Sequence, residues 1–137
     1  MTATGSKGRI LVMDDEDLIC KMLSHALSIS GYKVFVSRHG LEAIELYKLA
    51  KKSGRPFDAL IMDLKIKNGM DGHETMKRLI DIDPEVKAIV SSADLFHPAM
   101  LDHKNFGFKG SLPKPYSIKE LQTIISTLIH TREEQVS

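Results

Sequence analysis

The sequence contains no tryptophan, a single cysteine and few aromatic residues. The lone Cys20 excludes an intrachain disulfide and fits a reducing compartment, and its place in an apolar helical pattern predicts a small core residue. Clustered positive charge is also absent, because 19 Lys and Arg are balanced by 18 Asp and Glu for a net charge of +1. Surfaces that bind nucleic acid are basic, so we expect no direct contact with DNA or RNA.

Long apolar runs are missing as well. No stretch approaches the roughly 20 apolar residues that a membrane-spanning helix needs, and residues 1–8 lack the apolar centre of a signal peptide. We therefore expect a cytoplasmic protein that does not enter a membrane. With 137 residues, 42% of them hydrophobic, the chain can bury a core without disulfides or metals. The predicted organisation is one domain over residues 9–130, between a flexible lead at 1–8 and a flexible tail at 131–137.

Short apolar stretches alternate with stretches of helical periodicity along the chain. The predicted strands are 9–13, 33–37, 57–62, 86–91 and 108–112, and the predicted helices are 18–30, 40–52, 73–82, 98–105 and 118–130. The strand at 57–62 is almost wholly apolar, as expected of a strand buried on both faces of a parallel sheet. Because the links are short and crossovers are right-handed, the pattern predicts an α/β fold with a doubly wound sheet of five parallel strands and five helices.

Polar residues follow four of the predicted strands. Asp14 and Asp15 follow the first strand, Asp63 the third, Ser92 the fourth and Lys114 the fifth. The carboxyl ends of parallel strands share one sheet edge, which is where open α/β sheets bind ligands. Each residue also has a plainer interpretation, because Asp and Ser often cap helices and Lys is often a surface residue.

Several carboxylates converging on one point would repel each other. A hard divalent cation with oxygen ligands relieves that repulsion most directly, and Mg²⁺ is the natural choice because it uses few carboxylates and keeps several waters. A lysine and a hydroxyl nearby would complete a clamp for phosphoryl oxygens. Glu16 and Asp17 are interpreted as first-turn residues of the following helix rather than as ligands, and the six histidines show no metal-ligand spacing.

These motifs together resemble the receiver domain of response regulators over about residues 8–130. The matching pieces are Asp14-Asp15, Met62-Asp63, Ser92-Ala93 and Lys114-Pro115, in this order at the strand ends. The resemblance implies a flavodoxin-like fold with strand order 2-1-3-4-5. In the pattern of the loop after Asp63 the chain is most similar to receivers of hybrid sensor histidine kinases.

The resemblance also implies a function. Asp63 would accept a phosphoryl group from a phosphohistidine of a sensor histidine kinase or a phosphotransfer protein, with slow self-catalysed dephosphorylation and no multiple turnover. A downstream protein would bind the face formed by the fourth helix, fifth strand and fifth helix. The Lys114–Pro115 bond would be cis. The implied Mg²⁺ ligands are Asp14, Asp15, Asp63 and the backbone carbonyl of Lys65, and the implied contacts to the phosphoryl oxygens are Ser92 and Lys114.

Two regions depart from the usual receiver pattern. Ser111 stands where receivers commonly carry a Tyr or Phe that swings inward on phosphorylation, which puts that switch in question. The loop after Asp63 has Lys67 in place of a common Pro and is one residue longer. Within this loop, Lys65 is expected to pair with Asp94 over the site and to slow the attack of water on the acyl phosphate.

Two other functions are left open by the sequence. A phosphatase of the haloacid-dehalogenase type also uses an Asp nucleophile and Mg²⁺, but it needs Asp-x-Asp after the first strand, whereas Asp14 and Asp15 are adjacent. A receiver-like interaction module that never turns over phosphate is the other alternative, and the serine at position 111 is consistent with it. Uptake of a single phosphoryl group with Mg²⁺ would separate the receiver from both.

Overall fold

The computed structural model describes residues 6–136, with side chains up to residue 130. Five parallel strands form one sheet in the order β2-β1-β3-β4-β5. This confirms the predicted α/β fold and strand order. The strands are β1 (Gly8–Met13), β2 (Tyr32–Ser37), β3 (Ala59–Asp63), β4 (Ala88–Ser92) and β5 (Gly110–Pro113).

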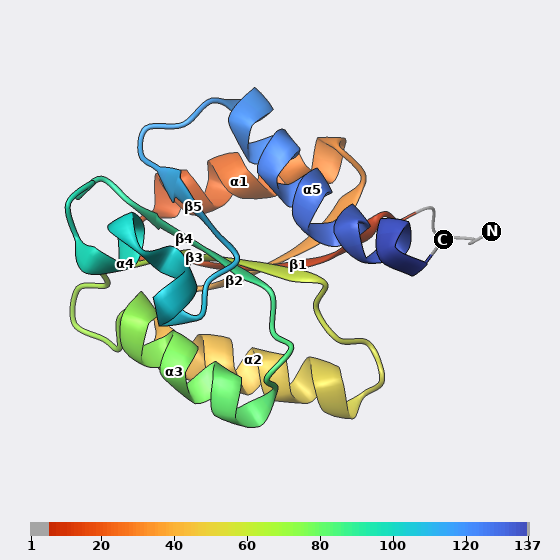
Figure 1. Ribbon diagram of the computed structural model, residues 1–137, viewed down its shortest axis with the longest axis horizontal. Coiled ribbons are helices and arrows are strands. Elements are labelled where there is room, and N and C mark those ends of the chain that lie inside the picture. The colour runs from red at the N-terminus through yellow and green to blue at the C-terminus, as the bar shows by residue number, and fades with distance from the viewer. Residues whose placement is uncertain (1–5, 137) are drawn as a thin grey trace.

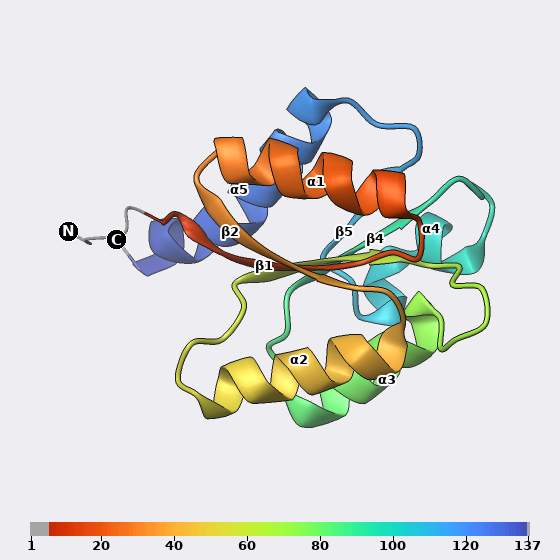
Figure 2. The same cartoon turned by 180° about the vertical axis from the view of Figure 1, so that it is seen from behind.

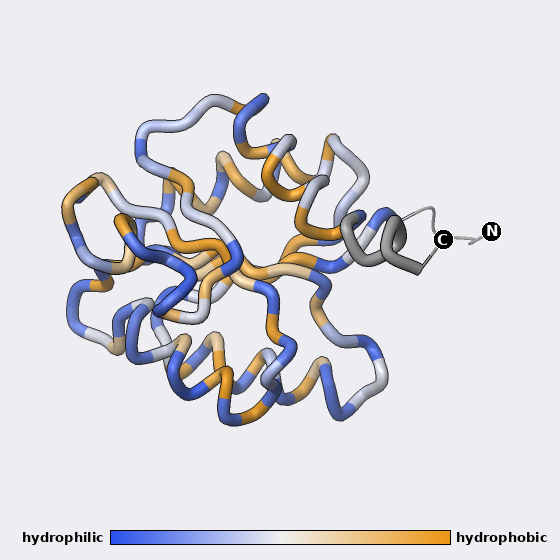
Figure 3. The backbone as a smooth tube through the Cα atoms, in the orientation of Figure 1, coloured by the Kyte–Doolittle hydropathy of each residue, from blue (hydrophilic) through white to orange (hydrophobic). Residues whose placement is uncertain are grey.

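Helices cover both faces of the sheet (Figures 1 and 2). One face carries α1 (Asp17–Ile29) and α5 (Ile118–Val136). The other face carries α2 (Gly40–Lys52), α3 (Gly72–Ile82) and the short α4 (Pro98–Leu101). Figure 3 shows apolar segments gathered on the central strands and on the helix faces turned toward them.

The central strand β3 explains why one apolar run dominates the sequence. All five of its residues are buried, and it lies between β1 and β4. Leu60 and Met62 pack into the cluster on the side of α2 and α3, whereas Ala59 and Ile61 pack into the cluster on the side of α1 and α5. Because side chains alternate along a strand, both faces of β3 must be apolar, and the only charged side chain it carries is at its end, on Asp63.

The prediction of one continuous helix at 98–105 is wrong. The chain forms α4 over Pro98–Leu101 and then a 3₁₀-helix over His103–Phe106. Asp102, with φ −138° and ψ 55°, leaves helical geometry between them, and Gly107 ends the segment with a positive φ of 90°. The weak amphipathic pattern of this region is therefore divided between two short turns.

The predicted boundaries of the domain stay predictions. Strand β1 begins at Gly8, and α5 continues to Val136, six residues past the predicted boundary at residue 130. Residues 1–5 and 137 of the predicted lead and tail lie outside the described residues. Cys20 is buried in the core as predicted. From residue 6 to 136, no helix combines the length and the apolar character that crossing a bilayer requires.

Candidate functional site

Three charged side chains from separate strand ends meet at the carboxyl edge of the sheet. This edge is on the left in Figure 1. Asp63 ends β3 and is 7% exposed, and Asp14 follows β1 and is 3% exposed. Lys114 follows β5, and its Nζ lies 3.0 Å from Asp14 Oδ2 and 3.4 Å from Asp63 Oδ2. The structure thus brings together an acid after β1, an acid after β3 and a lysine after β5.

The charges in this cluster do not balance. Burial, and then the charge of Asp14, raise the pKa of Asp63 to about 6, although Lys114 and a backbone hydrogen bond from Lys65 act in the opposite direction. Burial alone would lower the pKa of Lys114, but its hydrogen bond to Asp14 and the charge of Asp63 raise it overall. Two buried carboxylates therefore share one ammonium group, and an additional cation is electrostatically favoured.

A third carboxylate completes the acidic cluster. Glu16, at the N-cap position of α1, brings an oxygen within 4.8 Å of oxygens of Asp14 and Asp63. The sequence predicts Glu16 only as a first-turn residue of α1, and its place in a run of four acids is the one pattern that points to the cluster. Three carboxylates that converge with excess negative charge fit a hard divalent cation such as Mg²⁺.

Asp15 is placed differently from the other predicted ligands. Its Oδ2 accepts a hydrogen bond of 2.8 Å from the backbone N–H of Lys67, in the loop after Asp63, and its carboxylate is not part of the cluster with Asp14 and Glu16. In the described structure it is Glu16 that lies in the cluster with Asp14 and Asp63, at the place where the sequence predicted Asp15. The role of Asp15 as a metal ligand stays a prediction.

The remaining predicted residues lie around this cluster. Ser92 ends β4 and is buried, its carbonyl accepts a hydrogen bond from the Lys114 backbone N–H, and its hydroxyl accepts one of 3.0 Å from the Asp94 backbone N–H. Lys65 and Asp94 form an ion pair of 3.3 Å, which confirms the pairing predicted from the sequence. The Lys114–Pro115 peptide bond is cis, as the resemblance implied.

Comparison with known families agrees with this geometry. The model of the response regulator receiver domain matches residues 10–126, most of the chain. The chain belongs to this family. Receiver domains are the phosphoacceptor modules of two-component signalling systems, they bind Mg²⁺ at an acidic pocket, and they interact with histidine kinases or phosphotransfer proteins.

Individual relatives of this receiver are similar at moderate identity. Sporulation initiation phosphotransferase F of Bacillus subtilis is 31% identical, over 85% of this chain and 90% of that protein. Sensor kinase CckA of Brucella abortus is 28% identical over 96% of this chain, which spans only 14% of that kinase. The solved CheX-CheY-BeF₃-Mg²⁺ complex of Borrelia burgdorferi contains a chain that matches with a TM-score of 0.81 and 21% identity, covering 91% of each chain, which shows the shared fold.

Local packing fixes the end of β3 in this receiver. The Gly72 backbone N–H donates to the Leu64 carbonyl at 3.0 Å, so the first residue of α3 lies directly against the residue after Asp63. A Cβ at position 72 would lie 2.6 Å from the Asp63 carbonyl oxygen, closer than real Cβ contacts. Only glycine allows this approach of α3 to the end of β3.

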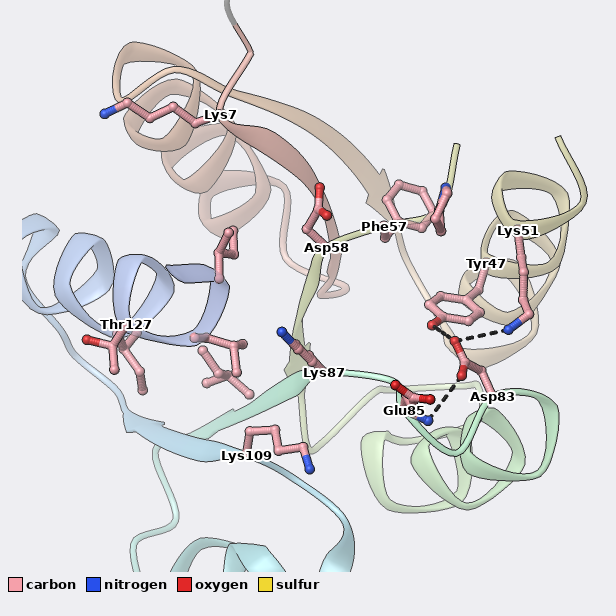
Figure 4. Close-up of a pocket in the computed structure, with 15 residues that line it drawn as sticks. Lys7, Tyr47, Lys51, Phe57, Asp58, Asp83, Glu85, Lys87, Lys109 and Thr127 are labelled. Carbon is pink, nitrogen blue, oxygen red and sulfur yellow. Dashed lines mark hydrogen bonds and ion pairs between the residues drawn. The ribbon is translucent and has the colours of Figure 1, made fainter. Parts of the chain in front are cut away.

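A cavity of about 950 Å³ lies at the opposite, amino edge of the receiver sheet, between α5 and α2 (Figure 4). The carboxylate of Asp83 there accepts a hydrogen bond of 2.7 Å from Tyr47 and pairs with Lys51 at 3.3 Å. Asp58 accepts a hydrogen bond of 2.7 Å from the Arg9 backbone N–H. These two acids are therefore already engaged in joining elements of the fold.

Proposed function

We propose that this receiver accepts a phosphoryl group on Asp63 from a phosphohistidine of a sensor histidine kinase or a phosphotransfer protein, in a reaction that requires Mg²⁺. The observation that carries the proposal is the buried Asp63 carboxylate, 3.4 Å from the Lys114 ammonium and beside a second buried acid. An oxygen of Asp63 forms the bond to phosphorus while the phosphorus–nitrogen bond breaks, and the histidine nitrogen leaves with the bonding pair. No other protein group needs to form a covalent bond.

The surrounding residues orient and neutralise the reacting groups. Asp14, Asp15, Asp63 and the Lys65 carbonyl would hold Mg²⁺, with Glu16 as a further acid at this position. The cation would neutralise charge on the carboxylate and on the phosphoryl oxygens, which otherwise repel each other. Lys114 would contact one phosphoryl oxygen, and Ser92 would donate its hydroxyl to another.

The relatives and the surface support a role in signalling through protein contacts. One relative is named a phosphotransferase and another a sensor kinase, and a solved relative is a complex with Mg²⁺. Exposed apolar side chains lie beside the phosphorylation site or on the proposed output face of α4, β5 and α5, among them Phe96, Leu101 and Ile118. We place the protein in the cytoplasm and its downstream protein partner on this face.

A phosphodonor assay tests the function as a whole. With Mg²⁺ and acetyl phosphate, intact mass should show one added phosphoryl group per chain, and removing Mg²⁺ with a chelator should prevent it. Continuous release of phosphate over many turnovers would instead indicate a phosphatase. No uptake at any Mg²⁺ concentration would indicate an interaction module that does not use phosphate.

The ion pair over the site predicts the lifetime of the phosphorylated state. Lys65 and Asp94 are partly exposed and bridge the loops that follow Asp63 and Ser92, so they restrict the approach of water to the acyl phosphate. We expect Lys65→Ala to accelerate dephosphorylation about threefold, as suits an exposed ion pair of less than about 1 kcal/mol. Lys67→Ala, in the same loop, is the control. An unchanged rate in Lys65→Ala would contradict this role.

A further inference from the structure

The loop between β3 and α3 contains an asparagine followed by a glycine, Asn68-Gly69. Both residues are exposed, and Asn68 has a positive φ of 56°, a conformation that asparagine tolerates better than most residues. A Cβ at position 69 would lie 2.9 Å from the Cβ of His39, so the packing of the loop favours glycine there. Gly69 thus has no side chain of its own to shield its backbone nitrogen.

The fold does not engage the polar groups of this pair. Within the described residues, neither the carboxamide of Asn68 nor the backbone N–H of Gly69 makes a hydrogen bond to another protein group. The residues on either side are held: the Lys67 backbone N–H donates to Asp15 at 2.8 Å, and the Met70 carbonyl accepts a hydrogen bond of 3.1 Å from the start of α2. Asn68 and Gly69 therefore form a short segment between two anchored points.

Two comparable places in the chain are protected by hydrogen bonds. Gly72 follows Asp71, but the Gly72 backbone N–H donates to the Leu64 carbonyl at 3.0 Å, and the Asp71 carboxylate caps α3. Asn105 is the only other asparagine in the sequence. It lies in the 3₁₀-helix, and its carboxamide donates to Asp102 at 2.5 Å. The structure thus distinguishes Asn68-Gly69 from both places.

We propose that Asn68 is a site of non-enzymatic deamidation, through a cyclic imide formed with Gly69. Asparagine is among the thermolabile residues of proteins. The backbone nitrogen of Gly69 loses its proton to solvent base and attacks the carboxamide carbon of Asn68. The new carbon–nitrogen bond forms as the side-chain carbon–nitrogen bond breaks, and the amide nitrogen takes a proton from water and leaves as ammonia. Water then opens the imide at either carbonyl, which gives aspartate or isoaspartate at position 68.

The modification changes the loop that follows Asp63. Either product adds one negative charge, which lowers the net charge of the chain from +1 to 0. Isoaspartate also lengthens the backbone by one methylene group between the anchored residues Lys67 and Met70, so the hydrogen bond from Lys67 to Asp15 has to adjust. The inference concerns the chemistry of this loop and does not depend on phosphorylation of Asp63.

Peptide mapping by mass spectrometry tests the inference on purified protein aged at mildly alkaline pH. We expect Asn68 to convert from amide to acid in the folded protein within about threefold of its rate in urea, because no hydrogen bond has to break first. Asn105 should convert about tenfold more slowly in the folded protein than in urea, because its hydrogen bond and its helical turn must open. The rate at Asn68 should rise with pH, since the attack requires removal of the Gly69 proton.

Asn68→Asp is the matched control, because aspartate also suits the turn and has no amide to lose. Its mass should stay constant during ageing, and the aged wild type should move to the position of this variant on ion exchange. If unfolding accelerates conversion at Asn68 as much as at Asn105, the fold protects both sites and the inference is overturned. Absence of conversion at Asn68 in the folded protein overturns it as well.

Discussion

We expect Asp63→Asn to abolish phosphorylation, with no added phosphoryl group detectable by intact mass after incubation with acetyl phosphate and Mg²⁺. The amide cannot act as the nucleophile, and the second buried acid, Asp14, is already hydrogen-bonded to Lys114. Asp81→Asn is a matched control, because Asp81 is an exposed acid on α3. Phosphorylation of Asp63→Asn at the wild-type level would place the acceptor elsewhere.

The same variant should be more stable than the wild type at neutral pH. The pKa of Asp63 is raised from 3.8 to about 6 in the folded protein, mainly by burial. The stabilisation from the proton on Asp63 is therefore complete below pH 3.8 and is lost as the pH rises through about 6, a difference of about 3 kcal/mol. Urea denaturation should show Asp63→Asn gaining up to this amount at pH 7, and the gain should shrink toward pH 4. A gain independent of pH would contradict this origin.

Lys114→Met should slow phosphorylation by about a hundredfold, the usual effect of removing one group that stabilises charge in a transition state. Lys114 is the one cationic side chain in the described part of the chain that forms ion pairs with both Asp14 and Asp63. Lys119→Met is the control, because Lys119 is an exposed lysine in the first turn of α5. The rate is measured by intact mass at saturating Mg²⁺, and a wild-type rate in Lys114→Met would remove this lysine from the mechanism.

Lys114→Met should also change how the stability of the protein depends on pH and on Mg²⁺. Without the ammonium group, two buried carboxylates face each other, and the pKa of Asp63 should rise further. The variant should therefore lose stability as the pH rises through and above 6, and Mg²⁺ should restore part of it by replacing the missing positive charge. Denaturation of this variant with and without Mg²⁺ at pH 5 and pH 7 measures both effects.

The fold could be predicted because the strongest signals in the sequence are local. The helix predicted at 40–52 has the observed bounds, and the apolar run at 57–62 ends one residue before the observed strand end at Asp63. Polar residues at strand ends are brought together by the parallel arrangement itself, so the meeting of Asp14, Asp63 and Lys114 followed from topology.

The features that could not be predicted depend on contacts between distant segments. Asp15 is turned toward the backbone N–H of Lys67, 52 residues further along the chain, and Glu16 lies in the cluster instead. The spacing of acids within one turn contains no information about which of them a distant loop will engage.

Because Gly72 lies so close to Asp63, there is no free space between the end of β3 and the start of α3. The start of α3 therefore holds the end of β3 in place, because the Gly72 backbone leaves no room for Asp63 to move toward it. On the other side of the site, α4 is only four residues long and is followed by a break at Asp102, so few helical hydrogen bonds hold this segment. We infer that signalling deforms the chain around α4 and leaves α3 in place as a rigid reference.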